Sequence, residues 1–145
     1  MARMKNLRKP SGRITLRITV FDGPPDCAEN FRKSFASARQ AARYLREELI
    51  PKSAAPFLFP VEKQDAINPA DLEKALETVA LETPECAQNA RAVMKIRRDL
   101  AEIEKLQDEM RCRAALAAIL ARWNRRFGRG KTGVRIEEEY RILRQ

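Results

Sequence analysis

The chain contains no histidine, and this absence removes several kinds of active site at once. Without an imidazole there is no Ser-His-Asp or Cys-His nucleophile pair, and no zinc site with histidine ligands. The three cysteines, Cys27, Cys86 and Cys112, are an odd number and form no Cys-X-X-Cys pair, which argues against a disulfide framework. Reduced cysteines are typical of the cytoplasm. We therefore expect a cytoplasmic protein that binds no metal and no other cofactor.

Long apolar segments are also absent. No run approaches the roughly 18 apolar residues that a membrane span requires, and no apolar stretch of the signal-peptide kind follows the basic N-terminus. The acidic groups 47–48 and 137–139 are each adjacent in sequence, whereas metal-dependent hydrolysis needs carboxylates that converge from separate elements. We expect neither membrane association nor enzymatic activity.

Positive charge, by contrast, is abundant. The chain has 29 Lys and Arg against 20 Asp and Glu, a net charge of +9 at pH 7. Both ends are basic, whereas residues 53–90 are acidic. A positive field of this size favours polyanionic partners: nucleic acid, an anionic membrane or an acidic protein surface. We take DNA or RNA as the expected partner, although a basic composition can also serve solubility alone.

Residues 13–21 alternate strictly between apolar and polar side chains, which predicts a β-strand with one buried face. A single strand is unstable and needs a partner. Residues 57–61 could at best form an edge strand, because Pro60 interrupts them. Residues 133–142 alternate too, but they also fit a helix. The third candidate is the same strand of a second copy.

Three helices are expected after this strand. Residues 27–50 carry an apolar stripe that includes Phe31 and Phe35, residues 51–60 read as an irregular linker, and residues 70–81 form a short helix. The longest helix runs over residues 84–127, about 44 residues or roughly 65 Å, from the N-cap Thr83 to Gly128. Its apolar stripe exceeds what the two other helices can cover. We therefore expect a homo-oligomer or a subunit of a larger complex.

These elements predict a mainly α protein with a small β element, an α+β fold in a helical-bundle or coiled-coil arrangement. Residues 1–12 form a flexible basic arm, residues 13–62 a strand–helix–linker module, and residues 63–145 a helical module with the long helix and a basic C-terminal segment. Together they predict one compact domain with a helical arm.

Basic residues gather in three places that could contact phosphates. The segment 122–133 combines five of them with Trp123, Phe127 and three glycines, as nucleic-acid-binding segments do. Four arginines share one side of the 27–50 helix, and two lie on the polar face of the strand. A helix end with core aromatics explains the first group equally well, and arginines that rim the core explain the second. For Trp123 we favour a core position over a stacking platform. The candidate residues are Arg122, Arg125, Arg126, Arg129 and Lys131, then Arg32, Arg39, Arg43 and Arg46, then Arg13 and Arg17.

Two stretches resemble DNA-binding families. The strand RITLRIT followed by helical sequence resembles ribbon-helix-helix proteins, in which a dimeric two-stranded ribbon reads the major groove. SARQAARYL and AINPADLEKAL, within residues 37–76, resemble the ends of an excisionase-type winged helix-turn-helix. The turn at residues 22–26 and the short, proline-broken stretch at 46–65 depart from these patterns, and we assign the chain to neither family.

The sequence thus predicts a non-catalytic nucleic-acid-binding protein, a regulator or a small subunit of a nucleoprotein complex. Two alternatives remain open. The chain could be an inhibitor or adaptor that docks its long helix on a larger partner, or a structural subunit of a phage-type assembly.

Overall fold

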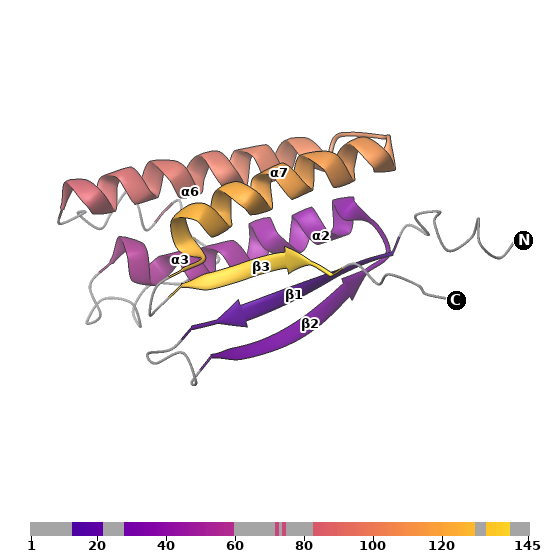
Figure 1. Cartoon of the computed structure of the whole chain (residues 1–145). Helices are drawn as coiled ribbons and strands as arrows, with labels where there is room; N and C mark the ends of the chain where they lie inside the picture. The colour runs from indigo at the N-terminus through magenta and orange to yellow at the C-terminus, as the bar shows by residue number, and fades with distance from the viewer. Residues whose placement is uncertain are drawn as a thin grey trace, which may run out of the picture.

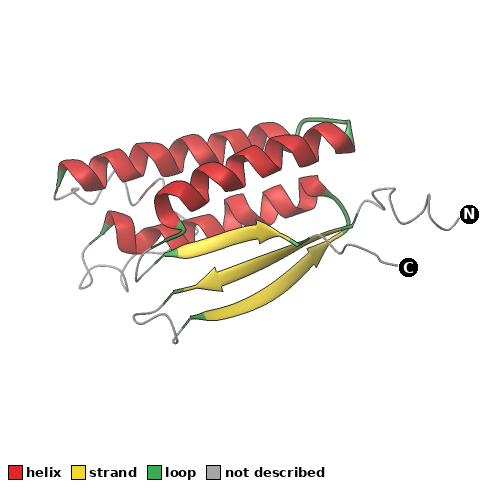
Figure 2. Ribbon diagram, in the orientation of Figure 1, coloured by secondary structure: helices red, strands yellow, loops and turns green. Residues whose placement is uncertain are grey.

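The protein folds into a three-stranded sheet with helices packed on one face, as the computed structural model in Figure 1 and Figure 2 shows. The structure describes residues 13–21, 28–59, 72, 74, 83–129 and 133–139. The predicted α+β class is confirmed, whereas a helical bundle or coiled coil is not. In chain order the elements are β1 (Ile14–Val20), β2 (Glu29–Phe35), α2 (Ala38–Tyr44), the π-helix η2 (Leu45–Leu49), α3 (Ile50–Leu58), α6 (Pro84–Ile103), α7 (Glu109–Phe127) and β3 (Val134–Glu138).

The strand predicted over residues 13–21 is confirmed as β1, the central strand of the sheet. It pairs antiparallel with β2 on one side and β3 on the other, so the sheet order is β2-β1-β3. Its apolar face is buried against the helices: Ile14 is 2% exposed, and Leu16 and Ile18 are fully buried. Of the alternatives for residues 133–142, the strand is correct over Val134–Glu138. Because both partners of β1 come from the same chain, its pairing differs from that of a ribbon-helix-helix dimer.

The first helix begins later than predicted, because residues 29–35 form β2 instead. Phe31 and Phe35, four residues apart, fit one side of a helix, but they also share one face of a strand. Backbone pairing with β1 decides in favour of the strand, with Phe35 opposite Ile14. Phe31 is therefore 45% exposed rather than part of the core. The helix starts at Ala38, where the hydroxyl of Ser37 accepts a hydrogen bond from the Gln40 amide.

Residues 38–58 then form one helical segment through α2, η2 and α3. The predicted irregular linker over 51–60 is wrong for residues 51–58, and Phe57 and Leu58 are helical rather than an edge strand. Pro51 has no backbone N–H and falls within the first two positions of α3, directly after the wider π-helical turn. A π-turn changes the local hydrogen-bonding pattern, so the proline does not end the helix. An uninterrupted helix also departs from the winged helix-turn-helix pattern.

The predicted helix over 84–127 has the correct ends but is not continuous. Thr83 caps its start and Gly128 its end, yet residues 104–108 divide it into α6 and α7, which lie side by side (Figure 1). The carboxylate of Asp108 accepts a hydrogen bond from the Met110 amide at 2.9 Å and so caps α7. Because the two halves pack on each other, one apolar stripe along a single rod no longer argues for a partner chain.

The helices form two levels above the sheet. α2 contacts β2 and α7 contacts β3, while α6 packs against α2, α3 and α7 (Figure 1). Trp123, Phe127 and Phe57 form an aromatic cluster in the core, with ring centroids 4.5 and 4.9 Å apart. Within the predicted helix 70–81, Leu72 and Lys74 are helical and Leu72 is buried. The rest of that helix and the basic arm 1–12 lie outside the described residues. Among the helices described, none is long and apolar enough to cross a membrane.

Candidate nucleic-acid interface

A groove of about 480 Å³ runs between the end of α7 and the strand β3. Three arginines line it: Arg125 and Arg129 at the end of α7, and Arg135 from β3. Ala117, Leu120 and Ala121 form the apolar part of its helical wall. The groove therefore joins part of the predicted basic segment to a strand that follows it in sequence.

The floor of the groove is fixed by hydrogen bonds from α7 to β3. The side-chain amide of Asn124 donates to the Ile136 carbonyl at 2.7 Å and accepts from the Ile136 N–H at 2.8 Å. The indole N–H of Trp123 donates to the Val134 carbonyl at 2.7 Å. Trp123 is fully buried, which confirms its predicted core position. These bonds hold the groove walls at a fixed separation.

Two glycines of the basic segment, Gly128 and Gly133, serve packing within the chain. A Cβ on Gly133 would lie 2.6 Å from the Phe127 carbonyl oxygen, and one on Gly128 would lie 2.6 Å from the Asn124 Cα. Such distances are too short for a side chain. Gly128 and Gly133 therefore allow the chain to leave α7 and enter β3 closely, instead of making room for a ligand.

Positive charge in the groove is unevenly compensated. Arg125 and Arg129 are exposed, and neither pairs with a carboxylate within the described residues; the Arg129 guanidinium donates only to the Arg125 carbonyl, at 3.2 Å. Arg135 pairs with Glu137 at 3.1 Å. Glu138 also lines the groove, but its side chain is 8% exposed and pairs with Arg113. Within the groove, the positive charge available to a ligand therefore lies at the end of α7.

The other predicted residues of the C-terminal group hold α7 in place. Arg122 pairs with Asp99 of α6 at 2.5 Å. Arg126 donates to the side chain of Asn89 at 2.9 Å, and its guanidinium carbon lies 5.9 Å from the centre of the Phe127 ring. Lys131 lies outside the described residues. Of the five predicted residues, the structure thus places two in the groove.

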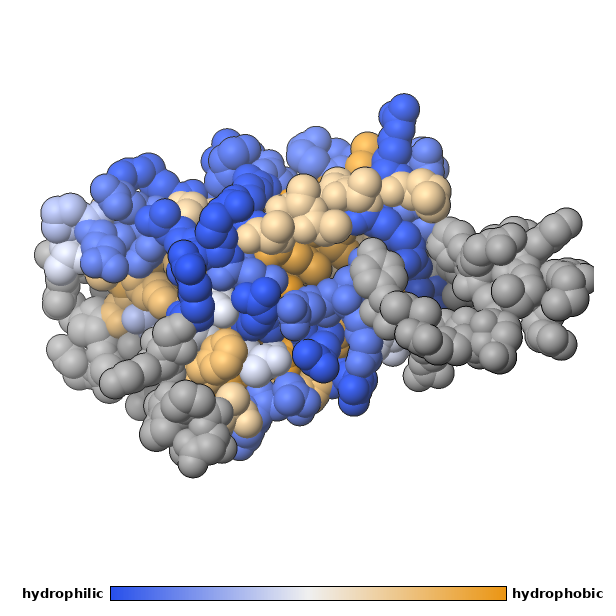
Figure 3. All heavy atoms as spheres, viewed as in Figure 1, coloured by the Kyte–Doolittle hydropathy of each residue, from blue (hydrophilic) through white to orange (hydrophobic). Residues whose placement is uncertain are grey.

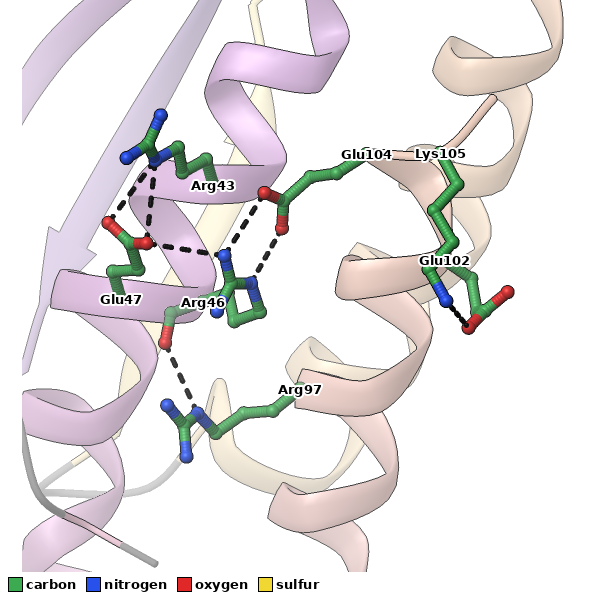
Figure 4. A network of polar contacts seen from close by, with 7 residues as sticks. All are labelled: Arg43, Arg46, Glu47, Arg97, Glu102, Glu104 and Lys105. Carbon is green, nitrogen blue, oxygen red and sulfur yellow. Dashed lines mark hydrogen bonds and ion pairs between the residues drawn. The ribbon is translucent and has the colours of Figure 1, made fainter. Parts of the chain in front are cut away.

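The row of four arginines predicted along the 27–50 helix does not exist as one row, because Arg32 lies on β2. Arg39 is exposed on α2, and Arg43 pairs with Glu47 at 3.4 Å. Arg46 binds Glu104, with its Nε 2.6 Å from one carboxylate oxygen (Figure 4). This hydrogen bond raises the pKa of Arg46.

Arg46 lies at the centre of a polar network between η2 and α6 (Figure 4). Its guanidinium also contacts Glu47 at 3.2 Å, and its backbone carbonyl accepts a hydrogen bond from the buried Arg97 at 3.2 Å. These contacts assign Arg46 to helix packing rather than to an open surface.

On the outer face of the sheet, Arg17 and Arg32 are directly opposite each other on β1 and β2. Both have carboxylate partners: Arg32 contacts Glu139 at 2.6 Å, and Arg17 lies 3.7 Å from Glu137. The hydrogen bond to Glu139 raises the pKa of Arg32. Arg13 is exposed just before β1. The outer face is therefore polar and largely charge-balanced.

Sequence reasoning missed Arg135 and Asn124. The signal for Arg135 was present, because alternation around Val134 and Ile136 places it on the opposite side of a strand. Asn124 had no such signal, since its role depends on β3 lying beside α7.

No protein-family model, curated protein or solved structure matches this chain. Within the part of the chain that the structure describes, no group of three acidic or cysteine side chains is placed to hold a metal ion. Cys86 and Cys112 are free thiols.

Proposed function

We propose that the protein is a non-catalytic nucleic-acid-binding protein, a regulator or small subunit of a cytoplasmic nucleoprotein complex, that binds phosphates in the groove between α7 and β3. The observation that supports this is the placement of Arg125 and Arg129, which are exposed and have no carboxylate partner among the described residues, beside Arg135. Guanidinium groups make forked hydrogen bonds to phosphate oxygens. Arg125 in the last turn of α7 and Arg129 just after the helix can contact neighbouring phosphates of a backbone.

The groove has little means of reading bases. The amide of Asn124, the kind of group that binds an adenine edge, is bound to the backbone of Ile136 and is not available to a base. Trp123 is buried and cannot stack on a base. Contacts to phosphate position a protein on nucleic acid without specifying sequence. We therefore propose binding with little sequence preference through this groove, to DNA or to RNA.

The test is the salt dependence of binding to plain duplex DNA and to single-stranded RNA. Each phosphate contact releases counterions, so losing Arg125 and Arg129 together should flatten the slope of log affinity against log salt by about 1.8 units on duplex DNA. The matched control is Arg91→Ala with Arg98→Ala, which removes the same charge from exposed positions of α6. This control should leave most of the slope in place.

The outcomes separate the possibilities. An equal or larger change in the α6 control would move the site away from the groove. An unchanged slope in the Arg125→Ala, Arg129→Ala variant, with its circular dichroism unchanged, would reject the groove. Wild-type protein that binds neither nucleic acid at low salt would reject the proposed function.

A second candidate is a protein-interaction module, either an adaptor or inhibitor or a structural subunit of a phage-type assembly. The exposed face of α7 favours it: Met110 is 62% exposed, and Ala114, Ala117, Ala118 and Ala121 are exposed along the same helix. Figure 3 shows a pale band of apolar side chains on the surface where α7 runs in Figure 1. Small side chains let another helix approach closely. This candidate becomes the better one if the nucleic-acid test fails.

A further inference from the structure

The outer edge of β2 presents backbone groups that no other described part of the chain covers. The Phe21 N–H donates to the Gly133 carbonyl at 2.9 Å, and the Glu139 N–H donates to the Thr15 carbonyl at 2.8 Å. The odd-numbered residues of β1 therefore form their backbone hydrogen bonds with β3. Because successive residues of a strand point to opposite sides, even-numbered residues of β1 bond to β2.

The same alternation fixes which residues of β2 face outward. Residues of β2 that are opposite Ile14, Leu16, Ile18 and Val20 bond to β1. The remaining three, Asn30, Arg32 and Ser34, direct their backbone N–H and C=O groups away from the sheet. No hydrogen bond from the described residues reaches these backbone groups, and no described element lies beyond β2 (Figure 1).

The opposite edge of the same sheet is treated differently. There, Asn124 and Trp123 bind the backbone of Ile136 and Val134, so that edge cannot pair with another strand. Proteins commonly block sheet edges in such ways to prevent association. Blocking β3 while β2 remains open leaves one edge available for pairing.

The side chains on the inner face of β2 are also incompletely covered. Phe31 is 45% exposed, and Glu29 and Lys33 on either side of it are exposed as well. The Lys33 ammonium lies 5.0 Å from the centre of the Tyr44 ring, on the side of the helices. The edge thus carries an apolar side chain flanked by one negative and one positive charge.

We infer that β2 is a homodimer interface, in which β2 of a second copy pairs antiparallel with it about a two-fold axis at Phe31. A two-fold axis places the same residues on both sides of the interface. In this register Phe31 is opposite Phe31 of the second copy, and Glu29 is opposite Lys33 on both sides of the axis. The hydrogen-bonded pairs are formed by Asn30 and Arg32, which have outward backbone groups. Two such pairs supply roughly four interchain hydrogen bonds.

Charge selects this register over its neighbours. The two-fold axis could pass through any residue of β2, because each choice still pairs Asn30, Arg32 and Ser34 with residues whose backbone groups also face outward. Moving the axis by one residue changes every opposing pair of side chains. A centre at Arg32 places two Arg32 side chains opposite each other, and a centre at Lys33 does the same for lysine. Like charges directly opposite are unfavourable, whereas opposite charges and aromatic pairs stabilise a sheet. Only the centre at Phe31 gives both an aromatic pair and two opposite-charge pairs.

The proposed dimer interface does not depend on nucleic-acid binding. The β2 edge is the far edge of the sheet from the groove, since β3 forms one wall of the groove and β1 lies between β3 and β2. A dimer of this kind has one continuous sheet made of two three-stranded halves, and each copy keeps its own groove.

A charge-reversal series measured by sedimentation equilibrium tests the interface on the full chain. The wild type should dimerise at micromolar to millimolar concentration. Lys33→Glu and Glu29→Lys each create two like-charge pairs and should raise the dimer dissociation constant about tenfold or more. The double variant Glu29→Lys, Lys33→Glu restores opposite charges and should regain most of the wild-type affinity. Circular dichroism verifies that each variant is folded.

A second pair of variants separates this edge from the exposed face of α7. Phe31→Thr should weaken the dimer, because it removes the central aromatic pair, whereas Met110→Thr should leave it unchanged. A wild type that is monomeric at every concentration would overturn the inference. So would a dimer that single reversals do not weaken, that the double reversal does not restore, or that depends on Met110 and not on Phe31.

Discussion

At the scale of single residues, arginine has two separate roles in this protein. Arg46 of η2 binds Glu104 at the C-terminal end of α6, at 2.6 Å, and Arg122 of α7 binds Asp99 of α6, at 2.5 Å. Both pairs hold α6 against a neighbouring helix. Arg125 and Arg129 have no such partner among the described residues and lie in the groove. Arg122, Arg125 and Arg129 even belong to the same basic segment. The difference comes from which side of its helix each residue occupies once the helices pack.

The pair of Arg122 with Asp99 makes a prediction about pH. Burial raises the pKa of Asp99, but its hydrogen bonds and charge contacts with Arg122 and Lys95 outweigh this, and the pKa is lowered from 3.8. A carboxyl whose pKa is lowered by folding stabilises the protein above its unfolded pKa, and loses this effect as pH falls through the folded pKa. Asp99→Asn should therefore reduce the free energy of unfolding at pH 7 by up to about 1 kcal/mol, a small value because the pair is partly exposed.

Urea unfolding at several pH values checks this prediction. The difference between the wild type and Asp99→Asn should be constant at neutral pH and disappear below the folded pKa of Asp99. Glu102→Gln removes an exposed carboxylate of the same helix and should have little effect at any pH. A wild-type advantage that stays constant between pH 7 and pH 2 would show that the variant acts by another route.

At the scale of elements, the sequence predicted most of the regular segments but missed α3 and several boundaries. The strand β1 and both ends of the α6–α7 segment could be predicted, because strict alternation, Thr83 and Gly128 are local signals. β2 could not be recognised by alternation, since Glu29, Phe31, Lys33 and Phe35 mix charge and apolar groups on its inner face. That mixture is stable only because β2 is an edge strand that the helices cover in part. Ser37 and Asp108 are capping signals in the sequence. The apolar stripes of the predicted helices continue past both residues, so neither helix start was predicted.

The break between α6 and α7 yields a prediction at this scale. The Asp108 carboxylate accepts the Met110 N–H at 2.9 Å and begins a helix that would otherwise start with unpaired amides. Asp108→Ala should lower the free energy of unfolding by about 1 kcal/mol, as N-cap losses do. Asp108→Asn keeps a capping oxygen and should stay close to the wild type. Chemical denaturation compares the two variants, and equal losses in both would mean that charge, not capping, is the source of the effect.

For the candidate site, the sequence predicted the basic segment but not which of its residues line the groove. Two of its five predicted members line the groove, and a third arginine comes from β3. Which members face the groove depends on the pairing of Asn124 with Ile136, a contact between different elements that local sequence does not encode. The place of Arg17 on the polar face of a strand was predicted, whereas Arg32 was expected on a helix and lies on β2. The pairing of these arginines with Glu137 and Glu139 requires β3 beside β1.

At the scale of the whole molecule, the fold is closed by its C-terminal strand. β3 is the last described element, yet it pairs with β1, the first. It also buries Ile136 completely and accepts the hydrogen bond of the Trp123 indole. The sheet, the helix α7 and the groove therefore all depend on one short strand.

We expect a chain that ends at residue 132 to lose cooperative unfolding. Without β3, β1 has one partner, its apolar face loses the neighbouring Val134 and Ile136, and the buried indole N–H of Trp123 loses its acceptor. A buried polar group without a partner costs about 1–3 kcal/mol, and each lost apolar side chain adds a cost of about 1.5–3 kcal/mol. These losses together approach the total stability of a small domain.

Thermal unfolding followed by near-ultraviolet circular dichroism measures the effect, because the protein has a single tryptophan. A synthetic peptide of residues 133–145 added to the shortened chain should restore the tryptophan signal. If the shortened chain unfolds cooperatively at the wild-type temperature without the peptide, then β3 is not required to close the fold.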